Sequence, residues 1–299
     1  MALPEKRKGE LYIFGQTVVG AFLPIAIVLS YVSLAPLTSL AWSTLIAVAC
    51  MGAVLLYRGK LRELVNVRLW KYCALVAFFI GVLLYGLYYS ALTLTTPGNV
   101  SIMLLFEVFT SYAFFRMFRS EKLPFSHIVG AILMVLGGGI ILLKDFSGIN
   151  IGDFLVLLAV MFAPVGNLYQ QEARKLASSE SVLFLRYLLS VPPLFILAYF
   201  FDGASSFNDV QASLLFLLIS GVLVFGISKL WWVEGIHRTS VPKAIALASV
   251  APFFTLVFAW IILSQPPTVW QLLSLIPLVL GTLFLTDHLK LRGSKNSIQ

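Results

Sequence analysis

About ten apolar stretches run from Leu11 to Thr286, each close to the roughly 20 residues that a helix needs to cross a bilayer. Backbone groups in lipid must form hydrogen bonds within their own segment, so continuous spans of this length are helices. The sequence therefore predicts an all-α membrane protein with about ten transmembrane helices. We place these helices at residues 11–31, 37–57, 70–93, 99–117, 127–144, 152–172, 181–201, 212–233, 243–263 and 268–287.

The distribution of charge predicts how the chain is oriented. The net charge is +8 at pH 7, but the basic residues lie at the membrane boundaries, so we expect no nucleic-acid partner. If the N-terminus is inside, the inside segments hold all 21 Lys and Arg residues except Lys144, Arg186 and Lys229. Cytoplasmic loops carry an excess of such residues. We therefore expect a multi-pass protein of the cell inner membrane with both termini in the cytoplasm.

The chain also contains an internal repeat. Residues 88–142 resemble residues 231–286, and a shift of about 145 residues superposes Pro97 on Pro242 and Phe109 on Phe254. Each half then holds five helices, and an odd number places the second half in the opposite orientation. We divide the chain into repeats 1–148 and 149–299. Inverted repeats with a site near the bilayer midplane are an architecture of secondary transporters.

Several motifs in these repeats match a known superfamily. They are Tyr88–Leu92, Arg119–Leu123, Lys229–Trp232, Val250–Pro252, the helices Gly130–Leu143 and Leu272–Leu285, and Gly152-Asp153 before a helix that ends at Lys175. With these motifs the chain resembles the drug/metabolite transporter superfamily, in its ten-helix EamA-type branch. The resemblance covers nearly the whole chain and implies transport by alternating access. Such families commonly have a proline in the middle of the fourth and ninth helices; Pro252 fits, whereas Glu107 stands in the first half.

Glu107 is the most informative candidate for function, because it lies near the middle of the fourth predicted helix. An ionisable group at that depth is costly and usually faces a cavity. Low dielectric favours its neutral form, which suits proton exchange. The sequence therefore predicts a proton or cation site at Glu107. The alternative is a structural Glu107 that pairs with Lys229, Arg186 or a hydroxyl group and joins two helices.

Two basic residues lie within the predicted helices. Lys229 is about one turn from the cytoplasmic end of the eighth helix, where it could reach the headgroups, pair with Glu107 or hold a substrate anion. Arg186 is about one turn into the seventh helix, where snorkelling or a bond to a neighbouring helix end competes with anion binding. Lys243 is foremost a determinant of topology.

Uncharged side chains complete the candidate site. Tyr89 and Trp231-Trp232 belong to aromatic pairs near the ends of the third and eighth helices. They could anchor the helices at the interface or contact a substrate. Asn167 and Gln16 could line the cavity or form hydrogen bonds between helices.

These observations predict a secondary transporter that exports small amphipathic metabolites or drugs, with Glu107 taking up a proton from outside as the solute leaves. The alternatives are a uniporter or exchanger of an anionic metabolite, and a lipid-handling membrane protein. Enzyme motifs are absent from the sequence, and Cys50, Cys73 and three separate His residues form no metal motif. We expect no catalytic residues, metal or cofactor, and a small-molecule substrate, lipid and protons as partners. A monomer is expected, with a dimer as the alternative.

Overall fold

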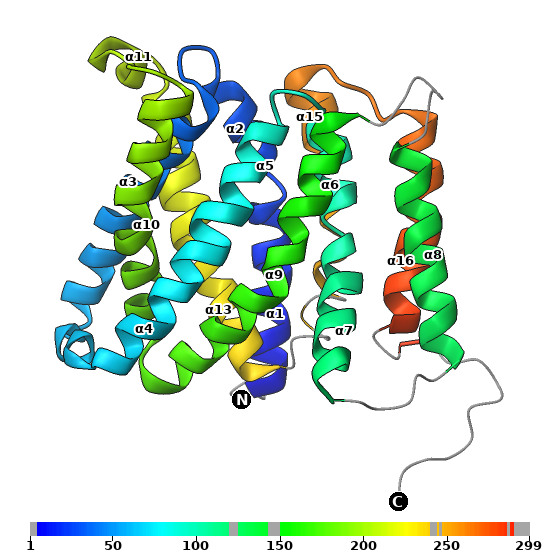
Figure 1. The fold of residues 1–299 in the computed structure, drawn as a ribbon, viewed down its shortest axis with the longest axis horizontal. Coiled ribbons are helices and arrows are strands. Elements are labelled where there is room, and N and C mark those ends of the chain that lie inside the picture. Colours follow the sequence, from blue (N-terminus) through cyan, green and yellow to red (C-terminus); the bar gives the residue numbers. More distant parts are fainter. Residues whose placement is uncertain are drawn as a thin grey trace, which may run out of the picture.

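The computed structural model describes residues 5–119, 125–142, 150–239, 244, 247–285 and 288–289, without the side chains of residues 6 and 115–119. Within these ranges the regular elements are all helical (Figure 1). In chain order they are α1 (Glu5–Gly20), α2 (Leu23–Ser30), α3 (Pro36–Tyr57), η1 (Leu61–Val65), α4 (Val67–Val76), η2 (Ala77–Leu84), α5 (Tyr85–Ala91), α6 (Pro97–Met103), α7 (Phe106–Arg119), α8 (Phe125–Leu142), α9 (Ile151–Leu176), α10 (Ser179–Phe201), α11 (Phe207–Ala212), α12 (Leu214–Leu218), η3 (Ile219–Ser228), α13 (Lys229–Arg238), α15 (Ala251–Leu263) and α16 (Val269–Leu285).

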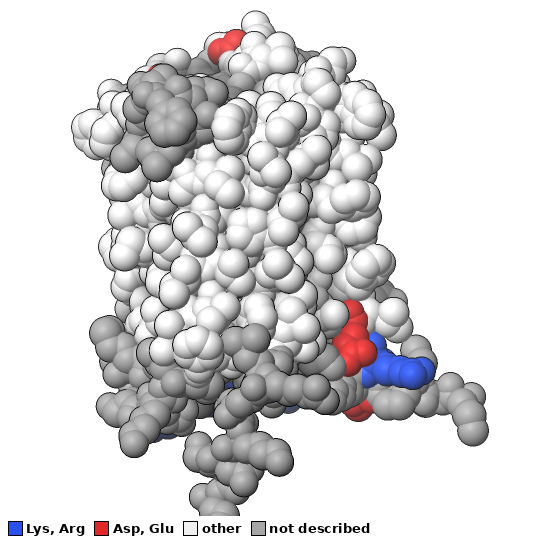
Figure 2. Space-filling model, turned by 90° about the vertical axis from the view of Figure 1, so that its right-hand side faces the viewer, with Lys and Arg blue, Asp and Glu red and all other residues white. Residues whose placement is uncertain are grey.

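The helices account for the predicted crossings. Among the described residues, seven helical stretches are long and apolar enough to cross a membrane. The fourth crossing is interrupted between α6 and α7, and α15 and α16 are the shorter apolar helices of the ninth and tenth crossings. The face shown in Figure 2 carries no charged side chain across its middle, and charge appears at its two ends. The prediction of an all-α, multi-pass membrane fold is confirmed.

Packing between the crossings follows the two halves of the chain. The second crossing packs against the seventh (α3 with α10), the fourth against the ninth (α6 with α15) and the fifth against the tenth (α8 with α16). The first packs against the eighth (α1 with α13), and the third packs against the sixth (α4 with α9). The first three pairs each join equivalent crossings of the two repeats. The last two pairs are equivalent to each other, because exchanging the halves turns the first and eighth crossings into the sixth and third. The arrangement is therefore what two repeats related by an axis in the membrane plane produce.

In the described part of the chain, three crossings are interrupted near their middle. The first turns at Ala21-Phe22, the fourth at Leu104-Leu105 and the ninth at Ser249-Val250. The shift that aligns the repeats brings Leu104 onto Ser249, so the last two interruptions are equivalent. Proline contributes to the breaks in the first and ninth crossings, which are followed by Pro24 and Pro252, because a proline donates no backbone hydrogen bond. Pro24 follows the first break, where the carbonyl oxygen of Ala21 accepts a hydrogen bond of 2.9 Å from Thr255 Oγ1.

The third and eighth crossings each contain a π-helical segment, η2 in the first and η3 in the second. π-Helical turns are rare and are frequent at functional sites. Tyr85 and Lys229 are the residues that directly follow the two segments. The structure thus brings matching irregularities from the two halves into the same region of the fold.

The two ends of the helix bundle differ in charge. We call the end where α3, α9 and α13 finish, at the bottom of Figure 1, the basic end. Its helix ends and loops carry Arg58, Lys60, Arg62, Arg68, Lys71, Arg174, Lys175 and Arg238. Asp202 and Asp209 flank the opposite end, beside α11. This asymmetry agrees with the uneven charge of the predicted loops; Lys144 and Lys243 lie outside the described residues.

Candidate functional site

A cavity of about 190 Å³ lies where the three helix interruptions meet the ends of the two π-helical segments. Apolar residues such as Ile80, Leu84 and Leu104 form much of its wall. The polar and aromatic side chains that line it are Gln16, Thr17, Tyr85, Tyr88, Ser101, Glu107, Asn167, Gln170, Arg186, Lys229, Trp232, Ser249 and Thr255. Cavities at interrupted helices are where membrane transporters place their solutes, because the free ends of half-helices face the cavity there.

Glu107 lines this cavity as the second residue of the half-helix α7. The partial positive charge of a helix N-terminus favours an acidic side chain at that position. Asn167 Nδ2 donates a hydrogen bond of 2.8 Å to Glu107 Oε1. Within the described residues, no ion pair joins Glu107 to Lys229 or Arg186. The partner of Glu107 in the structure is thus an amide.

Arg186 is buried, with only 2% of its surface exposed, so it does not reach the headgroup region. Its guanidinium carbon lies 5.1 Å from the ring centroid of Tyr187 and 5.6 Å from that of Tyr85. Nη1 donates a hydrogen bond of 3.3 Å to Oε1 of Gln170. Nε and Nη2 have no hydrogen-bond partner in the part of the chain that the structure describes.

Lys229 begins α13 directly after the π-helical segment η3 and is partly exposed to the cavity. Its Nζ lies 5.9 Å from the ring centroid of Tyr85, close enough for a cation–π contact. Tyr85 therefore lies near both cations of the cavity. The structure places Lys229 at the wall of the cavity.

Most of the residues selected from the sequence meet at this cavity. Gln16, Asn167 and Trp232 line it together with the three charged residues. Tyr89 and Trp231 do not. Tyr89 is fully buried, and its carbonyl oxygen accepts a hydrogen bond of 2.6 Å from the hydroxyl group of Tyr31. Trp231 packs against Gly15 of α1, where a Cβ would lie 3.0 Å from the indole ring.

Sequence reasoning missed Gln170 and Tyr85. Gln170 lies one helical turn after Asn167 in α9, so the spacing of polar residues on an otherwise apolar helix was an available signal. Tyr85 offered no such signal, because its position depends on the π-helical segment before it. In the described part of the chain, no group of three His, Cys, Asp or Glu side chains could hold a metal ion.

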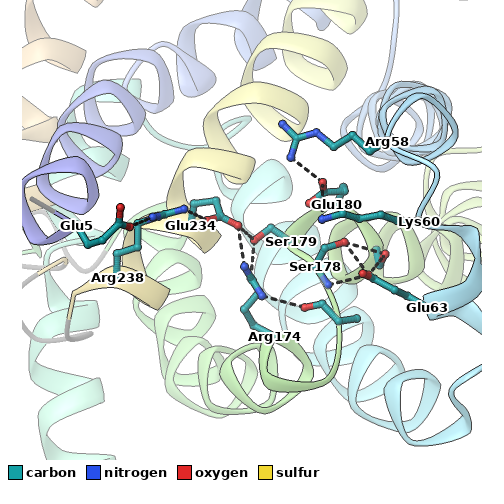
Figure 3. A network of polar contacts seen from close by, with 12 residues as sticks. Glu5, Arg58, Lys60, Glu63, Arg174, Ser178, Ser179, Glu180, Glu234 and Arg238 are labelled. Carbon is teal, nitrogen blue, oxygen red and sulfur yellow. Dashed lines mark hydrogen bonds and ion pairs between the residues drawn. The ribbon is translucent and has the colours of Figure 1, made fainter. Parts of the chain in front are cut away.

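A network of polar contacts joins the two halves at the basic end (Figure 3). Glu234 Oε1 accepts hydrogen bonds from Arg174 Nη2 at 3.0 Å and from Ser179 Oγ at 2.5 Å. Glu234 Oε2 accepts one of 3.1 Å from Arg238, which also pairs with Glu5 in the first helix. We call these five residues, with Arg58, Lys60, Glu63, Ser178, Glu180 and Ser181, the basic-end network.

The other half of this network lies between η1 and the start of α10. Glu180 accepts a hydrogen bond of 2.8 Å from Arg58 and lies 3.5 Å from Lys60 Nζ. Glu63 accepts hydrogen bonds from Ser181 Oγ at 2.6 Å and from Ser178 Oγ at 2.7 Å. Burial alone would raise the pKa of Glu63, but these hydrogen bonds outweigh burial and lower the pKa below its ordinary value. The ionised carboxylate is therefore the form that holds these segments together.

The basic-end network and the cavity share three helices. In α9, Arg174 follows the cavity residue Gln170 by one turn. In α13, Glu234 follows Lys229 by five residues, and in α10 Ser179 precedes Arg186 by about two turns. A shift of any of these helices would therefore move residues of both the cavity and the basic-end network.

Comparison with known proteins agrees with this geometry. The sequence matches the EamA-like transporter family twice, over residues 7–143 and 150–287. The chain belongs to the EamA-like transporter family. The double match confirms the fold of two repeats and the resemblance noted from the sequence. EamA-like transporters are membrane transporters, and this one is a multi-pass integral membrane protein.

Relatives add the following. A protein of Synechocystis sp. described as an uncharacterized transporter is 24% identical over 253 residues, which is 80% of this chain and 71% of that protein. A solved crystal structure superposes with a TM-score of 0.66 at 19% identity and covers 92% of this chain and 95% of its own. The second comparison shows a shared fold.

Proposed function

We propose that this EamA-like transporter moves a small organic solute across the membrane by alternating access, with the central cavity as the binding site. The observation that carries the proposal is the meeting of three interrupted helices at one cavity that contains Glu107. Non-helical backbone at membrane depth is tolerated where it lines a cavity, as these interruptions do. We place the boundary between the moving repeats after residue 148, within the gap between the two family matches.

Glu107 is the proton site in this proposal. It faces the cavity, it is held by an uncharged amide, and its alternative partners Lys229 and Arg186 form no ion pair with it. A carboxyl group in such surroundings can exchange a proton when the cavity opens to water. Export, the direction expected from the sequence, stays a prediction.

In this proposal, the basic-end network closes the cavity on the cytoplasmic side. The positive-inside rule supports a cytoplasmic position for the basic end. The network joins α1, α3 and η1 of the first half to α9, α10 and α13 of the second. Opening on that side requires these contacts to separate, while the solute stays bound between the same helices.

The test uses the purified full chain in liposomes. Solutes that raise the melting temperature in detergent are selected first, since a ligand that binds the folded state stabilises it. Their uptake is then measured with and without a pH gradient. We expect uptake to respond to the pH gradient in the wild type and not in Glu107→Gln. Glu172→Gln, at a partly exposed residue, is the control and should respond as the wild type does. Gradient-independent uptake that Glu107→Gln leaves intact would refute the role of Glu107. Vesicles that exchange no solute but scramble labelled lipid would refute solute transport.

A further inference from the structure

The cavity carries more positive charge than its own residues neutralise. Among the described residues, the charged side chains that line it are Arg186, Lys229 and Glu107. Two cations thus face one carboxylate, and the carboxylate is bonded to the amide of Asn167. A buried charge without a compensating partner is costly in a membrane interior. A cavity of this composition favours a ligand that brings negative charge.

Arg186 has the unused hydrogen-bonding capacity that such a ligand needs. Its side chain is almost fully buried, and Nε and Nη2 lack partners within the described residues. These two nitrogens lie on one edge of the guanidinium group, in the spacing that receives two oxygens of a carboxylate, phosphate or sulfonate. The contact of Nη1 with Gln170 and the rings of Tyr85 and Tyr187 hold the group in place.

Lys229 supplies a second cation to the same place. Lys229 Nζ and the guanidinium carbon of Arg186 lie 5.9 Å and 5.6 Å from the ring centroid of Tyr85. Lys229 has no ion-pair partner in the described part of the chain. Apolar residues Leu84 and Leu104, with the indole of Trp232, line the same cavity and can receive a hydrophobic body.

We propose that Arg186 and Lys229 form a subsite beside Tyr85 for the oxyanion group of an organic solute. This inference rests on the proposed function and names the class of solute as small apolar or aromatic molecules with one carboxylate, phosphate or sulfonate group. Trp232 and the apolar wall receive the body of the solute. The anionic group takes the place of the partner that the two cations lack.

The position of Glu107 then sets the sign of coupling to protons. Lys229 and Glu107 line the same cavity. Of the helices packed against α7, α16 carries no titratable side chain, α8 carries His127 bonded to Tyr112 of α7, and α9 carries its charged residues toward its two ends. Protonation of Glu107 removes a negative charge from the cavity that contains Lys229 and Arg186 and so strengthens anion binding. By reciprocity the anion strengthens proton binding. Proton and anion therefore travel together, in contrast to the exchange expected from the sequence alone.

The experiment measures binding to the detergent-purified full chain at pH 6 and pH 8. The probes are benzenesulfonate, benzyltrimethylammonium and benzyl alcohol, which share a ring and differ in permanent charge, so any pH dependence belongs to the protein. We expect benzenesulfonate alone to raise the melting temperature. Its Kd should rise at least about tenfold in Arg186→Met and in Lys229→Met, within the range of typical coupling energies, but not in Lys71→Met at the exposed basic end. If Arg186→Met does not fold, Lys229→Met alone tests the subsite.

The pH series tests the coupling. Benzenesulfonate should bind the wild type more tightly at pH 6 than at pH 8, and Glu107→Gln should bind it equally well at both. Tighter binding at pH 8, stabilisation by benzyltrimethylammonium in place of benzenesulfonate, or binding that both cation variants leave unchanged would overturn the proposal. These outcomes are separate from the liposome assay. A cation that is bound and transported would refute the subsite and leave transport intact, whereas a bound sulfonate with no solute crossing would refute transport.

Discussion

Asn167 donates a 2.8 Å hydrogen bond to Glu107 and so joins the sixth crossing to the half-helix α7 in the wall of the cavity. Asn167 is buried, and the bond fixes the orientation of the one acidic side chain among the described cavity residues. The carboxylate is thus positioned without being neutralised.

Replacing Asn167 by Leu removes the donor while keeping a side chain of similar size. We expect transport to fall about tenfold, because the carboxyl group loses its fixed orientation and a hydrogen bond to a charged group contributes about 1.5 to 3 kcal/mol. Ser111→Ala is the matched control, because Ser111 is a buried polar residue of α7 outside the cavity. An equal loss of transport in both variants would contradict a specific role for Asn167.

The contact between α8 and α16 predicts a difference between two glycines of one helix. A Cβ on Gly130 would lie 2.9 Å from the carbonyl oxygen of Gly281, whereas a Cβ on Gly139 would meet no atom within 4 Å. Gly130→Ala should therefore destabilise the protein by about 1 to 3 kcal/mol through overpacking. Gly139→Ala should be neutral or stabilise it by up to about 1 kcal/mol through helix propensity. Thermal unfolding in detergent measures both, and equal melting temperatures would contradict the close helix contact.

Glu63 predicts a dependence of stability on pH. Its pKa is lowered in the folded state, so its contribution is fully present above the ordinary value of 4.5 and is lost as the pH falls through the folded value. Glu63→Gln should lower the melting temperature at pH 7. The difference from the wild type should narrow below about pH 4.5. The exposed pair of Glu172 with Lys175 gives the control, since Glu172→Gln should change little at any pH. A gap between Glu63→Gln and wild type that stays constant down to pH 3 would contradict the lowered pKa.

The basic-end network predicts how the cytoplasmic side opens. Glu234→Gln weakens the ion pairs with Arg174 and Arg238. We expect a larger population of molecules in which the two halves are separated at that end. Spin labels on the exposed residues Arg62 and Lys175 measure the distance between the two halves. The fraction of molecules that show the longer distance should be several-fold larger than in the wild type. Lys8→Gln removes an exposed pair with Glu5 but keeps the pair of Glu5 with Arg238, so it should leave the distances unchanged. An unaltered distance distribution in Glu234→Gln would show that the network does not control opening.

Much of the fold could be predicted because the bilayer imposes its thickness on the sequence. Each predicted span coincides with a helix or a run of consecutive helical segments, apart from the start of the ninth, part of which lies outside the described residues. The largest differences are at the first helix, which begins at Glu5, and at the eighth crossing, which ends at Arg238. The interruptions were harder to predict. Pro24 and Pro252 mark two of them, but no proline or glycine accompanies the break at Leu104-Leu105. The π-helical segment Ala77–Leu84 is apolar throughout, so only tertiary packing reveals it.

The candidate site shows the same division. Glu107, Arg186, Lys229, Asn167 and Gln16 could be selected because polar side chains are conspicuous in apolar spans. The aromatic pairs could not be resolved, because neighbouring residues in a helix point in directions about 100° apart. Only one member of each pair can face the cavity, and the structure places Tyr88 and Trp232 there.

Alternating access through the central cavity is tested most directly by one cysteine. Leu104 lies at the helix interruption and lines the cavity. In a chain whose native Cys50 and Cys73 are replaced by alanine, Leu104→Cys is treated with a membrane-impermeant thiol reagent added to one side of the membrane or to the other. We predict that the cysteine reacts from both sides and that a bound solute slows both reactions. Reaction from one side only, whatever the pH or the solute, would contradict the account.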